Sequence, residues 1–180
     1  MCGIVAIYAY AAGAPPVDRD ALLRTRDAMI KRGPDGDGLW LADDGRVGLG
    51  HRRLAIIDPS PSGAQPMTSA DGRLRITYNG EIYNFRALRD ELAATGTVFT
   101  SQSDTEVLLH LYARDGAAMV EHLRGMYALA IWDEARRGVF LARDPFGIKP
   151  LYYGVAEDGF VFASEPQALL AAGLVTPAVE

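Results

Sequence analysis

The residue best suited to chemistry in this sequence is a cysteine directly behind the initiator methionine. Cys2 is the only cysteine among the 180 residues. If Met1 is removed, which the small cysteine side chain permits, Cys2 carries both a thiol and a free α-amine. The amine titrates near about 7.7–8.0 and the thiol near about 8.5, so both groups change protonation close to neutral pH. The pair could act as a nucleophile with its own base, although a free cysteine is also a common buried core residue.

Composition and charge exclude several classes of protein. The chain is 49% hydrophobic and 23% charged with a net charge of −5, which fits one substantial domain or two small ones. Its lysines and arginines are scattered, which argues against a nucleic-acid partner, and no apolar run approaches the ~20 residues that span a bilayer. His51, His110 and His122 lie far apart, so we expect no metal site. One cysteine cannot form an internal disulfide, which favours a reducing compartment, the cytoplasm.

Strands dominate the expected secondary structure. A first strand is predicted at residues 3–11, and further strands at residues 54–57 and 74–78. Three hairpins are expected at residues 38–42 with 47–51, 126–132 with 139–142, and 151–155 with 160–163.

Helices are predicted between these strands. One begins after Asp18 or Asp20, one after Asn84, and one at a capping box in residues 103–106, with shorter helices at residues 119–123 and 165–172. Residues 126–132 show no polar alternation, so their sheet should be covered on both faces. We therefore predict an α+β fold, a four-layer α/β/β/α sandwich of two mainly antiparallel sheets.

Three short polar segments interrupt the apolar pattern, at residues 51–54, 78–84 and 101–106. Each has a structural explanation. Arg52 and Arg53 could be solvated strand-end charges, and the Asn-Gly pair at 79–80 is a strong turn signal. Asp104 would be favoured in a first helical turn whatever it binds, and Glu106 could be the return half of the capping box.

With Cys2 and these polar segments, the sequence resembles the glutamine-hydrolysing domain of class II amidotransferases, which are N-terminal nucleophile hydrolases. Arg-Gly-Pro-Asp at 32–35 and Asn-Gly-Glu-Ile-Tyr-Asn at 79–84 resemble the asparagine synthetase branch. The resemblance covers essentially the whole chain, and its motifs lie at residues 1–5, 32–36, 50–58, 63–66, 78–84, 103–106, 125–128, 143–153 and 163–165.

The resemblance implies hydrolysis of glutamine to glutamate and ammonia through a γ-glutamyl thioester on Cys2. Attack on the amide places negative charge on the carbonyl oxygen. Hydrogen-bond donors must therefore already be positioned around that oxygen. By resemblance these donors are the Asn79 side-chain amide and the Gly80 backbone N–H. Glycine at 80 would also let the backbone approach the substrate closely. His51 is expected to be structural, because the N-terminal amine can serve as the base.

The resemblance also implies how glutamine would be held. Arg53 resembles the arginine that grips the α-carboxylate, and it is preferred to Arg52 because strand neighbours point to opposite faces. The Glu81 backbone and Asp104 resemble the groups that hold the α-ammonium. Backbone groups of Leu54 and Ile56 are further substrate-binding candidates.

The implied partner is an ATP-dependent synthetase domain, in cis or in trans, that uses the ammonia to amidate an acceptor such as aspartate. Its pyrophosphate-binding signature is not found in residues 1–180, so the chain is interpreted as the glutaminase domain alone. No cofactor is expected here, since ATP and magnesium belong to the synthetase domain. A homodimer of the full-length protein stays open. The competing hypothesis is a non-catalytic module that binds glutamine or a partner domain.

Overall fold

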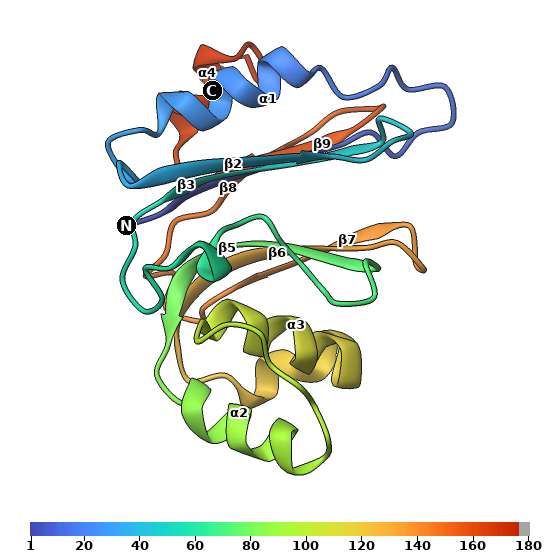
Figure 1. The fold of residues 1–180 in the computed structure, drawn as a ribbon. Coiled ribbons are helices and arrows are strands. Elements are labelled where there is room, and N and C mark those ends of the chain that lie inside the picture. Colours follow the sequence, from blue (N-terminus) through green and yellow to red (C-terminus); the bar gives the residue numbers. More distant parts are fainter. Residues whose placement is uncertain (177–180) are drawn as a thin grey trace. The chain divides into compact units, whose positions relative to one another are not determined.

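Residues 1–176 are described by a computed structural model, and the chain divides into two units. Unit 1 comprises Met1–Leu54 and the chain from Pro150 onward, and unit 2 comprises Ala55–Lys149. Each unit contains one antiparallel sheet and its own helices (Figure 1). None of the helices in residues 1–176 combines the length and the hydropathy needed to cross a bilayer.

The sheet of unit 1 has five strands in the order β2-β3-β1-β9-β8, and every neighbouring pair is antiparallel. The strands are β1 (Gly3–Tyr8), β2 (Gly36–Leu41), β3 (Val47–Arg53), β8 (Tyr152–Val155) and β9 (Phe160–Ala163).

Two helices, α1 (Arg19–Ala28) and α4 (Pro166–Ala171), lie on one face of this sheet (Figure 1). Asp18 caps α1, because its carboxylate accepts the backbone N–H of Asp20 at 2.8 Å. The helices and sheet share an apolar core to which both helices and strands β1 and β9 contribute: Val5, Leu22, Met29, Val161, Ala163, Ala168 and Leu169.

The sheet of unit 2 has the order β4-β5-β6-β7, again antiparallel throughout. Its strands are β4 (Met67–Thr68), β5 (Leu74–Ile82), β6 (Gly125–Asp133) and β7 (Gly138–Arg143). All of residues 127–133 are buried, so both faces of β6 are covered, as the lack of polar alternation predicts.

The helices of unit 2 are α2 (Phe85–Ala94) and α3 (Asp104–Asp115), with 3-10 turns at Pro61–Gly63 and Gly116–His122. Helix α3 contacts β5, and α2 packs on α3. The core between them is formed by large aliphatic and aromatic side chains that include Ile76, Leu92, Leu108, Leu111 and Ile131.

The three predicted hairpins are confirmed as β2–β3, β6–β7 and β8–β9. The α+β class with two antiparallel sheets is also confirmed. Two elements differ in extent or type, since the first strand stops at Tyr8 and the predicted helix at 119–123 is the 3-10 turn Gly116–His122.

The strand predicted at residues 54–57 is wrong. Strand β3 ends at Arg53, and the apolar residues after it continue as irregular chain. Asp58 turns the chain there, because its carboxylate accepts the backbone N–H groups of Ser60 at 3.0 Å and Gln102 at 2.9 Å. Ile56 is 65% exposed, so no packing against a sheet holds this run extended.

The turn interpretation of Asn79 and Gly80 is wrong as well. Strand β5 runs through both residues to Ile82 and pairs with β6 along its whole length, with Asn79 opposite Ala128 and Gly80 opposite Tyr127. Continuous pairing with a buried strand outweighs the local turn preference of the Asn-Gly pair.

Both predicted caps in unit 2 form differently from expectation. Ser103 caps α3 by accepting the Thr105 N–H at 3.1 Å, but Glu106 binds the N–H groups of Thr100 and Ser101 at 2.8 and 2.7 Å instead of closing a capping box. Asn84 stands at the start of α2 without capping it. Its side chain instead bonds main-chain atoms of the segment before β6.

Gly80 is predicted to be intolerant of a methyl group. A Cβ at this position would meet the carbonyl oxygen of Met126 and lie 2.8 Å from the Cα of Tyr127. We expect Gly80→Ala to lower the free energy of unfolding by about 1–3 kcal/mol, the usual cost of overpacking. Chemical denaturation measures this. Gly138→Ala is the control, because a Cβ there would lie 3.9 Å from the nearest neighbouring atom, the carbonyl oxygen of Arg136. Equal stability of both variants would contradict the packing argument.

Candidate active site

Cys2 is held at the end of β3 by main-chain atoms. Antiparallel pairing of β1 with β3 sets Gly3 opposite Arg52, which brings Cys2 beside the residues that follow. The Leu54 N–H donates to Sγ at 3.4 Å, and Sγ lies 3.6 Å from the Leu54 carbonyl oxygen. Leu54, a predicted substrate-binding residue, thus contacts the thiol through its main chain.

Arg32 fixes the main chain around Cys2. Its Nε donates to the Cys2 carbonyl at 2.9 Å, and its guanidinium pairs with Glu165 at 3.2 Å. The α-ammonium group of Met1 donates to the Arg32 carbonyl at 3.2 Å. With Met1 in place, the free amine therefore belongs to Met1, and Cys2 has only an amide nitrogen.

The two neighbouring arginines have different surroundings. Arg52 is buried, donates from Nε to the Gly33 carbonyl at 3.2 Å, and lies 3.6 Å from Asp37 and 3.7 Å from Asp27. Arg53 is only partly buried, and its side chain points to the other face of β3. Arg52 is thus committed to structural contacts, and a ligand-binding role for Arg53 stays a prediction.

His51 is completely buried in unit 1. Burial, followed by the positive charge of Arg53, lowers the pKa of His51 to about 3. The imidazole is therefore neutral near pH 7, which agrees with a structural role.

In unit 2, Asn79 has an unusual environment. The residue is 1% exposed, and its Nδ2 has no hydrogen-bond partner within the part of the chain that the structure describes. A buried unpaired donor costs about 1–3 kcal/mol, and most buried polar groups avoid this cost. The amide is therefore available to an oxygen atom of a ligand.

Asp104 opens α3 and is 4% exposed. Its Oδ2 accepts the Tyr78 hydroxyl at 2.8 Å and the Ile82 N–H at 3.1 Å. Burial raises the pKa of Asp104, while these hydrogen bonds act in the opposite direction. Both donors come from β5, so the bonds join the carboxylate to the strand that carries Asn79.

Gly80, Glu81 and Ile56 are the remaining predicted site residues. Glu81 is partly buried on β5 opposite Met126, so unit 2 gathers Asn79, Gly80, Glu81 and Asp104 on β5 and at the start of α3. Ile56 lies on the irregular segment after β3, and its side chain is exposed.

Residues that support the site were missed by the sequence reasoning. Arg32 beside Cys2 and Tyr78 beside Asp104 both lie inside the motifs, but no side-chain role is assigned to either from the residue pattern. Gln65 was missed too, although its amide bonds the backbone N–H of Tyr78 at 2.7 Å. The Gln-Pro step in the motif at 63–66 was the available signal.

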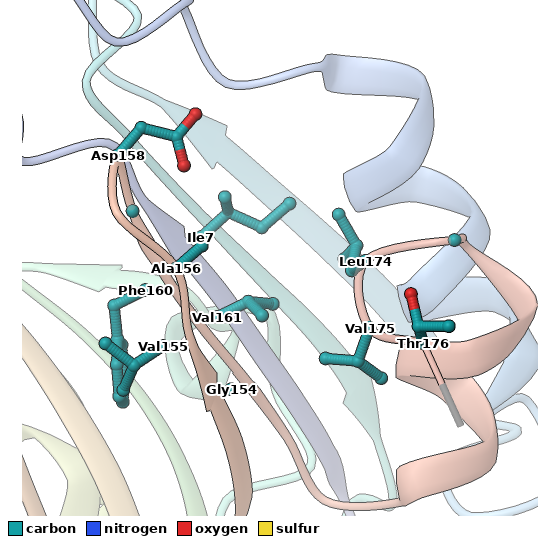
Figure 2. Close-up of a pocket in the computed structure, with 12 residues that line it drawn as sticks. Ile7, Gly154, Val155, Ala156, Asp158, Phe160, Val161, Leu174, Val175 and Thr176 are labelled. Carbon is teal, nitrogen blue, oxygen red and sulfur yellow. The ribbon is translucent and has the colours of Figure 1, made fainter. Parts of the chain in front are cut away.

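Other features of the described chain are weaker candidates. No group of three or more His, Cys, Asp or Glu side chains within residues 1–176 could hold a metal ion. A cavity of about 460 Å³ in unit 1 is lined mainly by apolar side chains, among them Ile7, Phe160, Val161 and Leu174 (Figure 2). It contains neither Cys2 nor Arg53, and its carboxylate is that of Asp158. The polar side chains that line the cavity are those of Asp158 and Thr176, and no thiol lines it.

The buried charge of Asp104 leads to a prediction on stability. Because its pKa is raised above the usual 3.8, folded Asp104 keeps its proton at pH values where the unfolded chain has lost it. Asp104 therefore makes the free energy of unfolding fall as pH rises from 3.8 through the raised pKa. Asn at this position keeps an oxygen for Tyr78 and Ile82 without the charge. We expect Asp104→Asn to unfold at the same temperature as wild type or higher at pH 7.

Thermal unfolding at pH 4 and pH 7 tests this expectation. Asp90→Asn, at an exposed position on α2, is the control and should leave the midpoint unchanged. A midpoint for Asp104→Asn several degrees below wild type at pH 7 would contradict the proposed cost of the buried charge.

A family model described as a glutamine amidotransferase domain matches residues 1–180. Asparagine synthetase (glutamine-hydrolyzing) 1 of Bacillus subtilis is 44% identical over 96% of this chain and 27% of its own length. Amidase chry2 of Gibberella zeae is 40% identical over 97% of this chain and 27% of its own length. A putative asparagine synthetase of Mycobacterium tuberculosis is 43% identical over 94% of this chain and 28% of its own length.

Among solved structures, the chain is similar to glutamine phosphoribosylpyrophosphate amidotransferase from B. subtilis, solved with ADP and GMP. The TM-score is 0.81 at 26% identity, over 96% of this chain and 44% of that one. This likeness confirms the predicted N-terminal nucleophile hydrolase type of α+β fold. The chain spans about a quarter of the length of the curated relatives named above.

Proposed function

The chain belongs to the glutamine amidotransferase domain family, and on this premise we propose that it hydrolyses L-glutamine to L-glutamate and ammonia with Cys2 as the nucleophile. One observation carries the proposal. The buried Asn79 amide keeps a donor without a partner in the described chain, which is what stabilisation of an oxyanion requires. A module that only had to fold would gain nothing from leaving this donor unpaired.

The reaction proceeds in two steps. The Cys2 thiol gives its proton to the Cys2 α-amine, and Sγ attacks the side-chain carbonyl carbon of glutamine. The carbonyl oxygen becomes an oxyanion that accepts hydrogen bonds from the Asn79 amide and the Gly80 N–H. The C–N bond then breaks, ammonia leaves with the proton, and a γ-glutamyl thioester remains. Water attacks the thioester through a second oxyanion, which releases glutamate and restores the thiol.

This use of the amine depends on removal of Met1. An amide nitrogen is not basic, so Cys2 gains a base only when its own amine is free. Met1 is 53% exposed, which supports its accessibility to an aminopeptidase. The Arg32 side chain would still hold the Cys2 carbonyl after Met1 is gone.

The remaining groups bind the amino-acid end of glutamine. Arg53 pairs with the α-carboxylate, for which the planar guanidinium is suited. The Asp104 carboxylate and the Glu81 backbone carbonyl hold the α-ammonium group. Backbone groups of Leu54 and Ile56 complete the proposed set, with Leu54 also bonded to the thiol.

We further propose that the ammonia serves an ATP-dependent synthetase domain that converts aspartate to asparagine. Relatives that carry the name asparagine synthetase are about four times as long as the match, which supports a further domain. ATP and magnesium would bind in that domain, with no cofactor in residues 1–180. The lone cysteine supports a cytoplasmic location.

Asn79→Ala tests the carrying observation. We expect kcat for ammonia release from glutamine to fall by about 100-fold or more, the usual effect of losing one oxyanion donor. KM should change much less, because the donor acts on charge that develops after binding. Steady-state ammonia release measures both constants.

Asn84→Ala is the matched control. Its side chain bonds the His122 carbonyl and the Arg124 N–H, each at 2.9 Å, so its loss should reduce stability and leave kcat unchanged. An Asn79→Ala protein with wild-type kcat would refute the oxyanion role. Glutamine binding without hydrolysis by the wild-type protein would instead support a non-catalytic module.

A further inference from the structure

Gln65 closes a ring of hydrogen bonds in unit 2. Its Oε1 accepts the Tyr78 backbone N–H at 2.7 Å, and its Nε2 donates to the Thr105 hydroxyl at 3.1 Å. The Tyr78 hydroxyl donates to Asp104 at 2.8 Å, and Thr105 is the next residue along α3. One side chain therefore joins the residue before Asn79 to the residue after Asp104.

The position of Gln65 follows from the length of β4. This strand has only two residues, and its register sets Met67 opposite Ile76 and Thr68 opposite Arg75. Continuing that register would set Gln65 opposite Tyr78, where β4 has already ended. The Gln65 side-chain amide takes the place of a strand partner for the Tyr78 N–H. Without it, the Tyr78 N–H on β5 would lose this acceptor, and a buried donor left unpaired destabilises the fold.

A second contact holds the segment that carries Gln65. The Asp58 carboxylate accepts the Gln102 N–H at 2.9 Å, just before α3, and the Ser60 N–H at 3.0 Å. The irregular chain between β3 and β4 is thus tied to the beginning of α3 at two points, Asp58 and Gln65. This arrangement leaves the Asp104 end of α3 little freedom to move relative to β5.

We propose that Gln65 is a positioning residue for substrate specificity: it sets the place of the Asp104 carboxylate relative to β5, and so enforces selection of substrates with an α-ammonium group. The inference rests on the proposed function, in which Asp104 holds that group. A charge-assisted contact depends on distance and direction, so a shift of Asp104 would weaken binding of the ammonium. Cleavage of the amide itself does not need this contact.

The test compares L-glutamine with glutaramate, the same amide without the α-amine. Ammonia release gives kcat/KM for each compound. Wild type should prefer glutamine, and Gln65→Met should reduce the ratio of the two kcat/KM values at least tenfold. Gln167→Met, the same change at an exposed position on α4, should keep the wild-type ratio.

Thr105 provides an independent variant if Gln65→Met does not fold. Thr105→Val removes the acceptor for Nε2 and should also lower the ratio, whereas Thr105→Ser keeps a hydroxyl and should retain it. Equal losses for both compounds, with the ratio unchanged, would overturn the positioning role, because general damage affects both alike. Wild-type protein that fails to prefer glutamine would overturn the proposed role of Asp104, and this inference with it.

Discussion

The unbroken pairing of β5 with β6 is the constraint on which the candidate site in unit 2 depends. It keeps Asn79, Gly80 and Glu81 in extended conformation through a sequence that locally favours a turn. The close approach of β6 at Gly80 excludes a side chain there, which gives this glycine a packing reason beside any catalytic one. The same strand supplies both hydrogen-bond donors to Asp104, so one element positions the Asn79 amide and the buried Asp104 carboxylate.

Unit 1 holds Cys2 in place at the beginning of the chain. Terminal residues are usually poorly ordered unless they are tied down. Cys2 is tied by the register of β1 on β3, by the Leu54 main chain at its sulfur, and by Arg32 at its carbonyl. These contacts use no atom of the proposed free amine. The fold can therefore keep Cys2 in place while its nitrogen acts as a base.

Sequence patterns predicted the secondary structure correctly where the pattern of apolar and polar residues was clear. The hairpins, such as the one that joins β2 to β3, were predicted correctly, and so was the covering of β6 on both faces. Prediction failed where tertiary contacts decided the outcome. Ile56 lies in an apolar run that has no partner strand, and the Asn79-Gly80 step is held extended by β6.

The candidate site was predictable only in part for similar reasons. Residue types and motifs pointed to Cys2, Asn79 and Asp104, since their chemistry is visible in the sequence. The supporting role of Gln65 was not visible, because it depends on where β4 ends and on which residue of β5 then lacks an acceptor. The same holds for Arg32, whose contact with Cys2 joins residues 30 positions apart.

The most direct test of the central claim is the intact mass of the purified protein before and after treatment with 6-diazo-5-oxo-L-norleucine, a glutamine analogue that alkylates thiols. The proposed mechanism predicts a chain without Met1 that gains a single adduct, and no adduct on Cys2→Ala. A chain that keeps Met1, or that loses it and gains no adduct, would contradict the claim that Cys2 is a mature N-terminal nucleophile facing a glutamine site.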